Sequence, residues 1–280
     1  MPKLIIGTAN FTQPYGILSS GQMPKAEATE ILKTAIDNHI TALDTAMDYG
    51  DLTDIIPSTV LQKCRCVSKY SVLTETPTLF AALDRLHHET TIEALLIHDP
   101  KNIQKNNLTT IKARITEIRE RYQIPKIGVS IYEPEDLDAF MDIMVPEVIQ
   151  LPYNPFNQIF NNPTFLRFVA NNHIEIHARS LFLQGILLTD ALPPSLQALM
   201  PLWLQFQEHL QSHENKQQAL LQWAFSQPWV DSWVLGVDSV EQLQQIIQAM
   251  KQQDQKIPDF TAFSLVQNPL ADPRQWATLA

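Results

Sequence analysis

Eight short apolar segments recur along this chain of 280 residues, separated by stretches with the amphipathic pattern of helices. The segments are rich in Ile, Val and Leu without strict alternation, which is typical of parallel strands buried on both faces. They are Leu4–Thr8, Thr41–Asp44, Cys64–Lys69, Ala94–His98, Lys126–Ser130, Glu147–Leu151, Glu175–Ser180 and Ser232–Gly236. This alternation predicts a parallel α/β fold.

The predicted helices carry apolar residues three and four positions apart. Within Ala26–Asn38, for example, Ile31 and Ala35 fall on one face. The other helical stretches are Thr78–His88, Ile111–Tyr122, Pro134–Met144, Pro163–Asn172 and Val240–Met250, a weaker candidate over 51–63 and two helices within 196–226, followed by an irregular tail over 252–280.

Two architectures accommodate eight strand–helix units: an open, doubly wound sheet and a closed (β/α)8 barrel. Eight units in 280 residues favour the closed TIM barrel, because such barrels commonly have about this length. No linker or low-complexity tract interrupts the chain. We therefore expect one domain of the α/β class spanning residues 1–280.

The charge and the cysteines exclude several classes of partner. A formal net charge of −10 repels nucleic-acid backbones and anionic membranes, and no apolar run is long enough for a membrane span. The N-terminus lacks the apolar core of a signal peptide. Cys64 and Cys66 are too close in a strand for a disulfide and too few for a zinc site. These features favour a cytoplasmic protein without a metal ion.

The seven glycines exclude two common nucleotide-binding motifs. No pair has the spacing of the G-x-G-x-x-G fingerprint, and the one pair five residues apart, Gly16 and Gly21, is not followed by Lys and Ser or Thr. A dinucleotide would therefore have to be held without a Rossmann fingerprint or a P-loop.

Ionisable side chains stand at the ends of three consecutive apolar segments. Asp44 ends the second, Lys69 the third and His98 the fourth, and Tyr49 follows Asp44 in the next loop. In a barrel these ends meet at the C-terminal face, where active sites lie. A tyrosine is a weak acid, with a pKa near ~10, and a neighbouring ammonium is expected to lower that pKa. The set predicts a proton donor for a carbonyl that receives hydride.

At these residues the chain resembles the aldo-keto reductases, and in particular their bacterial members. An ordered series of motifs carries the resemblance over nearly the whole chain. They are LIIGTA at 4–9, ALDTAMDYG at 42–50, VSKY at 67–70, LLIHDP at 95–100, IGVSIYEPEDL at 127–137, IQLPYNPFNQ at 149–158, ARSLFLQGILL at 178–188 and VLGVDSVEQL at 234–243.

The resemblance implies reversible, NAD(P)H-dependent reduction of a small aldehyde, ketone or sugar-like carbonyl. It makes Tyr49 the general acid, assisted by Lys69, Asp44 and His98. It also implies that Ser130 and Gln150 bind the nicotinamide carboxamide, that 180–184 approaches the pyrophosphate and that 236–242 approaches the adenosine. The full set of implied cofactor contacts is Gly7, Thr8, Ser130, Gln150, Arg179, Ser180, Leu181, Gln184, Gly236, Val237, Asp238 and Gln242.

The chain departs from the family pattern at three of these positions. Ile131 follows Ser130 where many members have Asn, and Arg179 stands where many have an aromatic residue that stacks on the nicotinamide. No Lys or Arg occurs between Val234 and Met250, and Asp238 occupies a position where a cation is often found. The resemblance implies NADPH by default, but recognition of its 2′-phosphate calls for Lys or Arg, so the cofactor is given as NAD(P)H and the choice between NADH and NADPH stays open.

Two other function classes fit parts of this pattern. A lysine on the third strand of a barrel could form a Schiff base, as in some aldolases, which would make the chain a lyase. The altered adenosine segment and Arg179 would also suit a weakly catalytic nucleotide-binding relative that acts as a sensor or partner subunit. The sequence predicts neither the substrate nor the oligomeric state.

Overall fold

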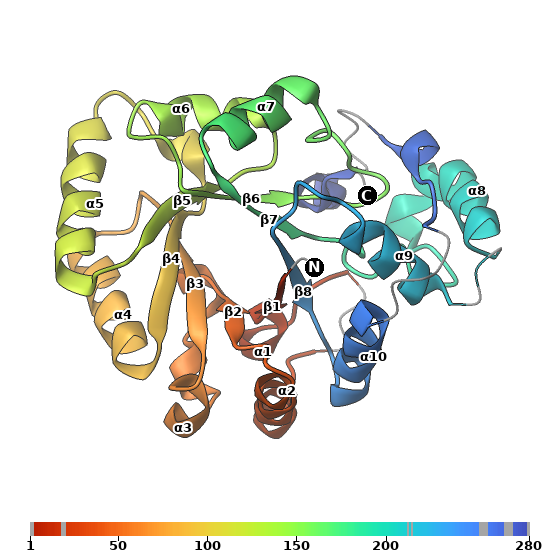
Figure 1. Ribbon diagram of the computed structural model, residues 1–280, viewed down its shortest axis with the longest axis horizontal. Coiled ribbons are helices and arrows are strands. Elements are labelled where there is room, and N and C mark those ends of the chain that lie inside the picture. Colours follow the sequence, from red (N-terminus) through yellow and green to blue (C-terminus); the bar gives the residue numbers. More distant parts are fainter. Residues whose placement is uncertain are drawn as a thin grey trace.

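Eight parallel strands close into a barrel in which each strand pairs with the next and the last pairs with the first (Figure 1). The structure, a computed structural model, describes residues 3–17, 21–211, 213, 215–251, 257–265 and 271–278. The predicted single-domain (β/α)8 barrel is confirmed, and every predicted strand is present with small shifts at its ends. The strands are β1 Lys3–Gly7, β2 Ala42–Asp44, β3 Arg65–Tyr70, β4 Thr91–Ile97, β5 Lys126–Ser130, β6 Val148–Pro152, β7 Glu175–Arg179 and β8 Ser232–Gly236.

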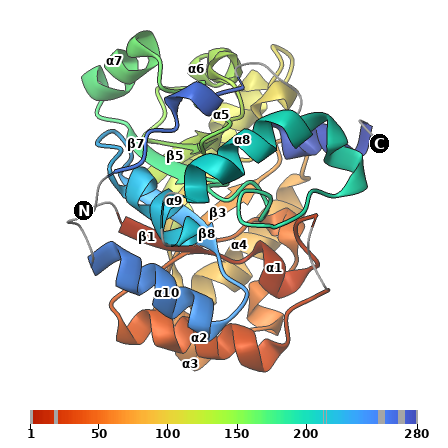
Figure 2. The same ribbon diagram turned by 90° about the vertical axis from the view of Figure 1, so that its right-hand side faces the viewer.

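The helices form a layer around the outside of the barrel (Figures 1 and 2). Each turns an apolar face inward; α2, for example, buries Ile31, Leu32 and Ala35 completely. Helices α2 and α10 pack side by side, which brings the start of the chain next to its last strand–helix unit. The helices are α1 Ala9–Thr12, α2 Lys25–Asp37, α3 Ser58–Leu61, α4 Thr76–Glu89, α5 Leu108–Tyr122, α6 Leu137–Met141, α7 Pro163–Asn171, α8 Met200–Gln211, α9 Lys216–Phe225 and α10 Val240–Lys251.

Two helical predictions change in detail. The weak candidate over 51–63 splits into a 3₁₀ turn and α3 on either side of Pro57, because proline cannot donate the hydrogen bond that a continuous helix needs. The stretch from Pro134 begins as a 3₁₀ turn before α6, and the predicted pair within 196–226 is confirmed as α8 and α9. The predicted irregular tail lies partly outside the described residues; its described parts contain 3₁₀ turns at Thr261–Phe263 and Pro273–Thr278.

The barrel interior is a small apolar cluster separate from the larger core between strands and helices. Gly128 of β5 lies against β6, since a Cβ atom there would stand 1.9 Å from the carbonyl oxygen of Val148. Glycine therefore permits β5 and β6 to pair closely, which places Ser130 beside Gln150 in the sheet register. The interior cluster consists of Ile5, Ala42, Val67, Ala94, Leu96, Val148 and Val234.

Cys64 and Cys66 are buried free thiols. None of the helices within the described ranges is both long and apolar enough to cross a membrane. Among the described side chains, no group of three or more His, Cys, Asp or Glu is arranged to hold a metal ion.

Candidate active site

Four of the sequence-predicted site residues occupy the uppermost inward positions of alternate barrel strands. Residues two apart on a strand share a face, so the positions above Ile5 and Val67 of the interior cluster are Gly7 and Lys69. Alternate strands of a TIM barrel contribute four side chains to each layer. The strand pairing completes this layer with Ser130 of β5 and Arg179 of β7, and it places Lys69 and Arg179 on opposite strands.

A buried ion pair joins Lys69 of this layer to Asp44 directly beneath it. The Lys69 ammonium donates to Asp44 Oδ1 at 2.6 Å and to the Thr45 carbonyl oxygen at 2.8 Å, and Lys69 is only 1% exposed. The second carboxylate oxygen of Asp44 accepts a 2.6 Å hydrogen bond from Gln150 Nε2. Three strands therefore hold one compact network, in which both charges are shielded from water.

Tyr49 and His98 extend this network toward the mouth of the barrel. Tyr49 lies in a 3₁₀ turn, Met47–Tyr49, directly after β2, and its ring centroid is 5.4 Å from Lys69 Nζ. The His98 ring meets the Tyr49 ring edge-on, with 5.9 Å between centroids. His98 Nδ1 lies 3.3 Å from Asp48 Oδ2, a contact that the sequence analysis did not predict. The structure thus brings together all four residues predicted for catalysis.

The pKa of Tyr49 differs from the prediction. Burial raises this pKa well above its ordinary value and the Asp44 carboxylate raises it further, whereas Arg179 lowers it. The expected net lowering of this pKa does not hold in this structure, because burial of the phenol is the largest effect and the Asp44 carboxylate adds to it. Tyr49 therefore keeps its proton at neutral pH.

His98 is neutral at neutral pH. Burial lowers its pKa and the Lys69 charge lowers it further, while the hydrogen bond to Asp48 acts in the opposite direction. An ionised carboxylate only accepts hydrogen bonds, so the contact with Asp48 places the proton of the neutral ring on Nδ1.

The buried polar atoms beside this network that have no hydrogen-bond partner among the described residues include two on paired strands, Ser130 Oγ and Gln150 Oε1. Buried polar groups are normally satisfied, so such a pair at a barrel mouth suggests a ligand. A hydroxyl and an amide oxygen on paired strands match the acceptor and donor of a carboxamide. On the other side of the mouth Gly7 pairs with Gly236, where a Cβ atom would have no neighbour within 4 Å. The residues present therefore fit a nicotinamide nucleotide.

The loop after β7 has an unusual backbone. Ser180, Leu183 and Gln184 all have positive φ angles of 47–63°, which is costly for residues other than glycine and is commonly found at ligand sites. The Leu181 side chain is buried, and Gln184 Oε1 accepts from the Ile17 backbone. Of the cofactor contacts implied in this loop, Leu181 could therefore offer only backbone atoms, and Gln184 holds the loop before α2.

The segment between β8 and α10 is bordered by carboxylates. Asn10 Nδ2 donates to the Val237 carbonyl oxygen at 2.8 Å and to Asp238 Oδ1 at 2.9 Å. Glu27 Oε1 of α2 accepts from the Val240 amide at 3.1 Å, and Gln242 Oε1 accepts from the Asp238 amide at 2.7 Å. The sequence analysis missed Asn10 and Glu27, because only the fold brings them to residues more than 200 positions away.

The remaining predicted contacts have mainly structural surroundings. Thr8 is completely buried, and its hydroxyl donates to the Asp44 carbonyl oxygen at 3.0 Å. Val237 is also completely buried. Their side chains fix the loops after β1 and β8 and leave only backbone atoms for a ligand.

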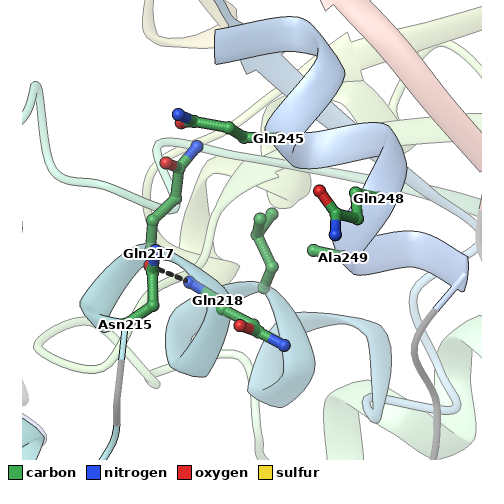
Figure 3. A pocket seen from close by; sticks show the side chains of 7 residues that line it. Asn215, Gln217, Gln218, Gln245, Gln248 and Ala249 are labelled. Carbon is green, nitrogen blue, oxygen red and sulfur yellow. Dashed lines mark hydrogen bonds between the residues drawn. The ribbon is translucent and has the colours of Figure 1, made fainter. Parts of the chain in front are cut away.

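A groove between the outer helices α9 and α10 is a different kind of site (Figure 3). Gln217, Gln245 and Gln248 extend into it from the two helices. Its lining contains amides and apolar side chains but no ionisable group, so it offers no proton donor or acceptor for catalysis.

Solved structures with the same fold include three bacterial proteins. A putative aldo-keto reductase from Pseudomonas aeruginosa is 18% identical, with a TM-score of 0.61 and 88% of each chain covered. A glycerol dehydrogenase from Gluconobacter oxydans is 16% identical, with a TM-score of 0.64 over 90% of this chain and 86% of that one. An aldo-keto reductase from Bacillus halodurans in its holo form is 14% identical, with a TM-score of 0.67 over 99% of this chain and 92% of that one.

At these identities the likeness concerns the fold alone, and no curated protein sequence matches the chain. The family itself is identified by a sequence model described as the aldo/keto reductase family, which matches residues 66–263. This match includes Lys69 and His98 but neither Asp44 nor Tyr49, whose placement beside them comes from the geometry above. It spans more than half of the chain, which therefore belongs to the aldo-keto reductase family and is an oxidoreductase.

Proposed function

We propose that this chain reduces a small aldehyde, ketone or sugar-like carbonyl to the alcohol, with Tyr49 as the general acid. Membership of the family supports NAD(P)H-dependent carbonyl reduction in general. The observation that carries the specific assignment is the position of the Tyr49 ring, 5.4 Å from the buried Lys69 ammonium and 5.9 Å from the His98 ring. The nicotinamide, when bound, supplies hydride to the carbonyl carbon.

The residues of the chain donate a proton to the carbonyl oxygen and stabilise the negative charge that develops during the reaction. Tyr49 donates its phenolic proton to the carbonyl oxygen, and the C–O double bond becomes a single bond. Its raised pKa suits this role, because the phenol stays protonated until the oxygen becomes a strongly basic alkoxide. Lys69 stabilises the negative charge left on Tyr49, and Asp44 holds Lys69 in place. The neutral His98 ring, whose Nδ1 proton is directed at Asp48, packs edge-on against Tyr49 and positions the phenol.

The environment of Lys69 argues against a Schiff-base lyase. A lysine nucleophile must lose its proton, whereas the Lys69 ammonium donates to both Asp44 and Thr45 in a buried site. We infer that this amine stays charged. Treatment with borohydride and a carbonyl substrate should therefore leave Lys69 unlabelled in a mass spectrum, and covalent labelling would favour the lyase.

The nicotinamide end of the cofactor is assigned to Ser130 and Gln150. Their partnerless buried oxygens support hydrogen bonds to the carboxamide. The open space beside Gly236, where an added Cβ atom would meet nothing within 4 Å, supports passage of the nucleotide along the end of β8.

The adenosine end favours NADH over NADPH. The segment from Val234 to Met250 contains no Lys or Arg, and Glu27 and Asp238 bring two carboxylates to the start of α10. A 2′-phosphate placed there would meet negative charge, without the cation that normally binds it. Fluorescence titration should give a Kd for NADH at least about tenfold below that for NADPH. Asp238→Lys should reduce this preference, whereas Asp259→Lys, in the tail, should preserve it.

The activity is tested with Tyr49→Phe. This substitution removes only the phenolic oxygen, so turnover of any carbonyl substrate should fall by about 10²–10⁴-fold while NADH still binds. Tyr15→Phe is the matched control, because Tyr15 is 47% exposed and its charge interactions place it near Tyr49. Undiminished turnover in Tyr49→Phe would refute the assigned acid, and nucleotide binding without turnover in the unmodified chain would favour a non-catalytic relative.

A further inference from the structure

Two arginines contact the Tyr132 ring at the mouth of the barrel, but only one is neutralised. Arg274 Cζ lies 3.3 Å from the ring centroid and Arg179 Cζ lies 4.2 Å from it. The Arg274 guanidinium donates to both oxygens of Asp272, at distances down to 2.7 Å. Arg179 forms no ion pair in the part of the chain that the structure describes; its guanidinium hydrogen bonds, to Ile131 O and Ser180 Oγ, are 3.4 Å long.

The charges around the barrel mouth leave Arg179 uncompensated. Arg179 and Lys69 stand on opposite strands of one layer, and the carboxylate beneath them, Asp44, already accepts from Lys69 and Gln150. Asp136 accepts from backbone amides and lies 3.6 Å from Lys101. A partly buried guanidinium that loses water without gaining a carboxylate is costly unless a ligand supplies the anion.

The direction of the Arg179 side chain identifies the side of the mouth that it serves. From β7 it reaches the Ile131 carbonyl and the Tyr132 ring, which follow β5. It therefore leans away from the glycine seam between β8 and β1 and toward the half of the mouth where Tyr49 and His98 stand. Although burial dominates both pKa shifts, the Arg179 charge also acts on Tyr49 and His98.

We propose that Arg179 binds a carboxylate of the substrate, so that the preferred substrates of this chain are carbonyl compounds with a carboxylate a few bonds from the carbonyl carbon. A planar guanidinium matches a carboxylate with two parallel hydrogen bonds. Stacking on Tyr132 holds the guanidinium plane in place before the substrate arrives. This inference rests on the proposed function for the location of the carbonyl group, and it adds the class of substrate.

The test compares two probes that differ in charge, 4-oxobutanoate and its neutral amide 4-oxobutanamide. Binding of each is measured by calorimetry with NADH present, in the Tyr49→Phe background so that turnover does not consume the probe. We expect the carboxylate to bind about 10–100-fold more tightly than the amide, as for a charge-assisted hydrogen-bonded pair. Arg179→Gln in the same background should abolish this preference and change the affinity for the amide by less than about threefold.

The matched control is Asp272→Asn with Arg274→Gln, which removes the neutralised pair from the same Tyr132 ring and should preserve the preference. Equal affinity for the two probes in the parent, failure of both to bind, or a preference that survives Arg179→Gln would overturn the proposal. A loss of NADH affinity in Arg179→Gln as large as the loss of carboxylate affinity would assign Arg179 to the cofactor pyrophosphate instead.

These outcomes are distinct from failure of the proposed function. The unmodified chain could reduce neutral aldehydes without preferring the carboxylate, which would overturn only the assignment of Arg179. Preferential binding of the carboxylate without any turnover would overturn only the reductase activity.

Discussion

The two ends of the barrel use charge in opposite ways. At the N-terminal end, Arg65 Nε lies 3.1 Å from Glu93, and Glu175 binds both Lys126 and His177, so these charges neutralise each other. At the C-terminal end, Arg179 has no carboxylate partner among the described residues, and Ser130 Oγ and Gln150 Oε1 have no hydrogen-bond partner there. In TIM barrels the N-terminal face contributes stability and the C-terminal face catalysis. Because Arg65 Nε and His177 Nδ1 at the N-terminal end also lack hydrogen-bond partners among the described residues, the difference teaches that a charge without a counter-charge identifies the site better than an unpaired polar atom does.

Removing one lysine from each end of the barrel should give the largest difference between the two ends. Lys69→Met should lower kcat/KM by about 10³–10⁴-fold, because Tyr49 loses the cation that stabilises its developing charge. Lys126→Met, at the start of β5, should leave kcat/KM within about threefold, because the ion pairs of Lys126 within the described residues are with Glu93 and Glu175, away from the site.

Both lysine variants must be compared in the folded state. Lys69→Met also leaves Asp44 as a buried, unpaired carboxylate, which costs about 3–5 kcal/mol of unfolding free energy. Circular dichroism therefore sets the temperature at which each variant is assayed. Similar losses of kcat/KM in folded Lys69→Met and Lys126→Met would show that the two ends do not differ in function.

Two glycines test whether the layers between the ends are packed as described. Gly128→Ala should destabilise the chain by more than about 3 kcal/mol, since the added Cβ would stand 1.9 Å from Val148 O and force β5 and β6 apart. Gly236→Ala should cost less than about 1 kcal/mol, because a Cβ there meets nothing within 4 Å. Urea unfolding measures both values, and equal stabilities would contradict the close approach of β5 and β6.

The ion pairs at the N-terminal end should also affect how the unfolding free energy changes at acidic pH. The hydrogen bond from His177, together with Lys126, lowers the pKa of Glu175 to about 2 from its ordinary 4.5, against the effect of burial. A carboxylate with a lowered pKa stabilises the fold above its unfolded pKa, and this contribution is lost as the pH falls from about 4.5 to about 2. Glu175→Gln should therefore lose about 2 kcal/mol less unfolding free energy than the parent between pH 6 and pH 2.5. Identical pH dependence of urea unfolding in the two proteins would contradict this assignment.

The barrel could be predicted from the sequence because each of its strands and helices is encoded by a short, continuous segment. Each strand is a short run rich in Val, Ile and Leu, and each helix has a 3.6-residue period. Asp44, Lys69 and His98 could be found for the same reason, since each ends an apolar run whose neighbours in space are set by strand order. Helix boundaries were predicted less well where proline divides the segment, as at Pro57.

The rest of the site depends on distances that the sequence does not contain. The pKa of Tyr49 was predicted in the wrong direction because its sign depends first on how deeply the fold buries the phenol and then on how close the phenol lies to Asp44. Glu27 was missed because only the packing of α2 against α10 brings it to Val240. The direction of Arg179 was also beyond prediction, since the loop after β7 adopts positive φ at ordinary residues such as Ser180.

The smallest expected effect concerns Asp48, an exposed carboxylate that contacts His98 in the candidate active site. Burial and the Lys69 charge lower the pKa of His98, and Asp48 opposes them through its hydrogen bond. Asp48→Ala should therefore lower the pKa of His98 further, so the acidic limb of the kcat/KM profile and the NMR titration of the ring should both move to lower pH. Because Asp48 is 58% exposed, the rate at neutral pH should change by less than about tenfold. The control is Asp51→Ala. The Asp51 carboxylate pairs with Arg85, so its removal should leave the acidic limb of the kcat/KM profile in place.

Movement of this acidic limb to higher pH in Asp48→Ala would mean that a group other than His98 titrates there. It would also mean that the proton on Nδ1 of His98 does not depend on Asp48.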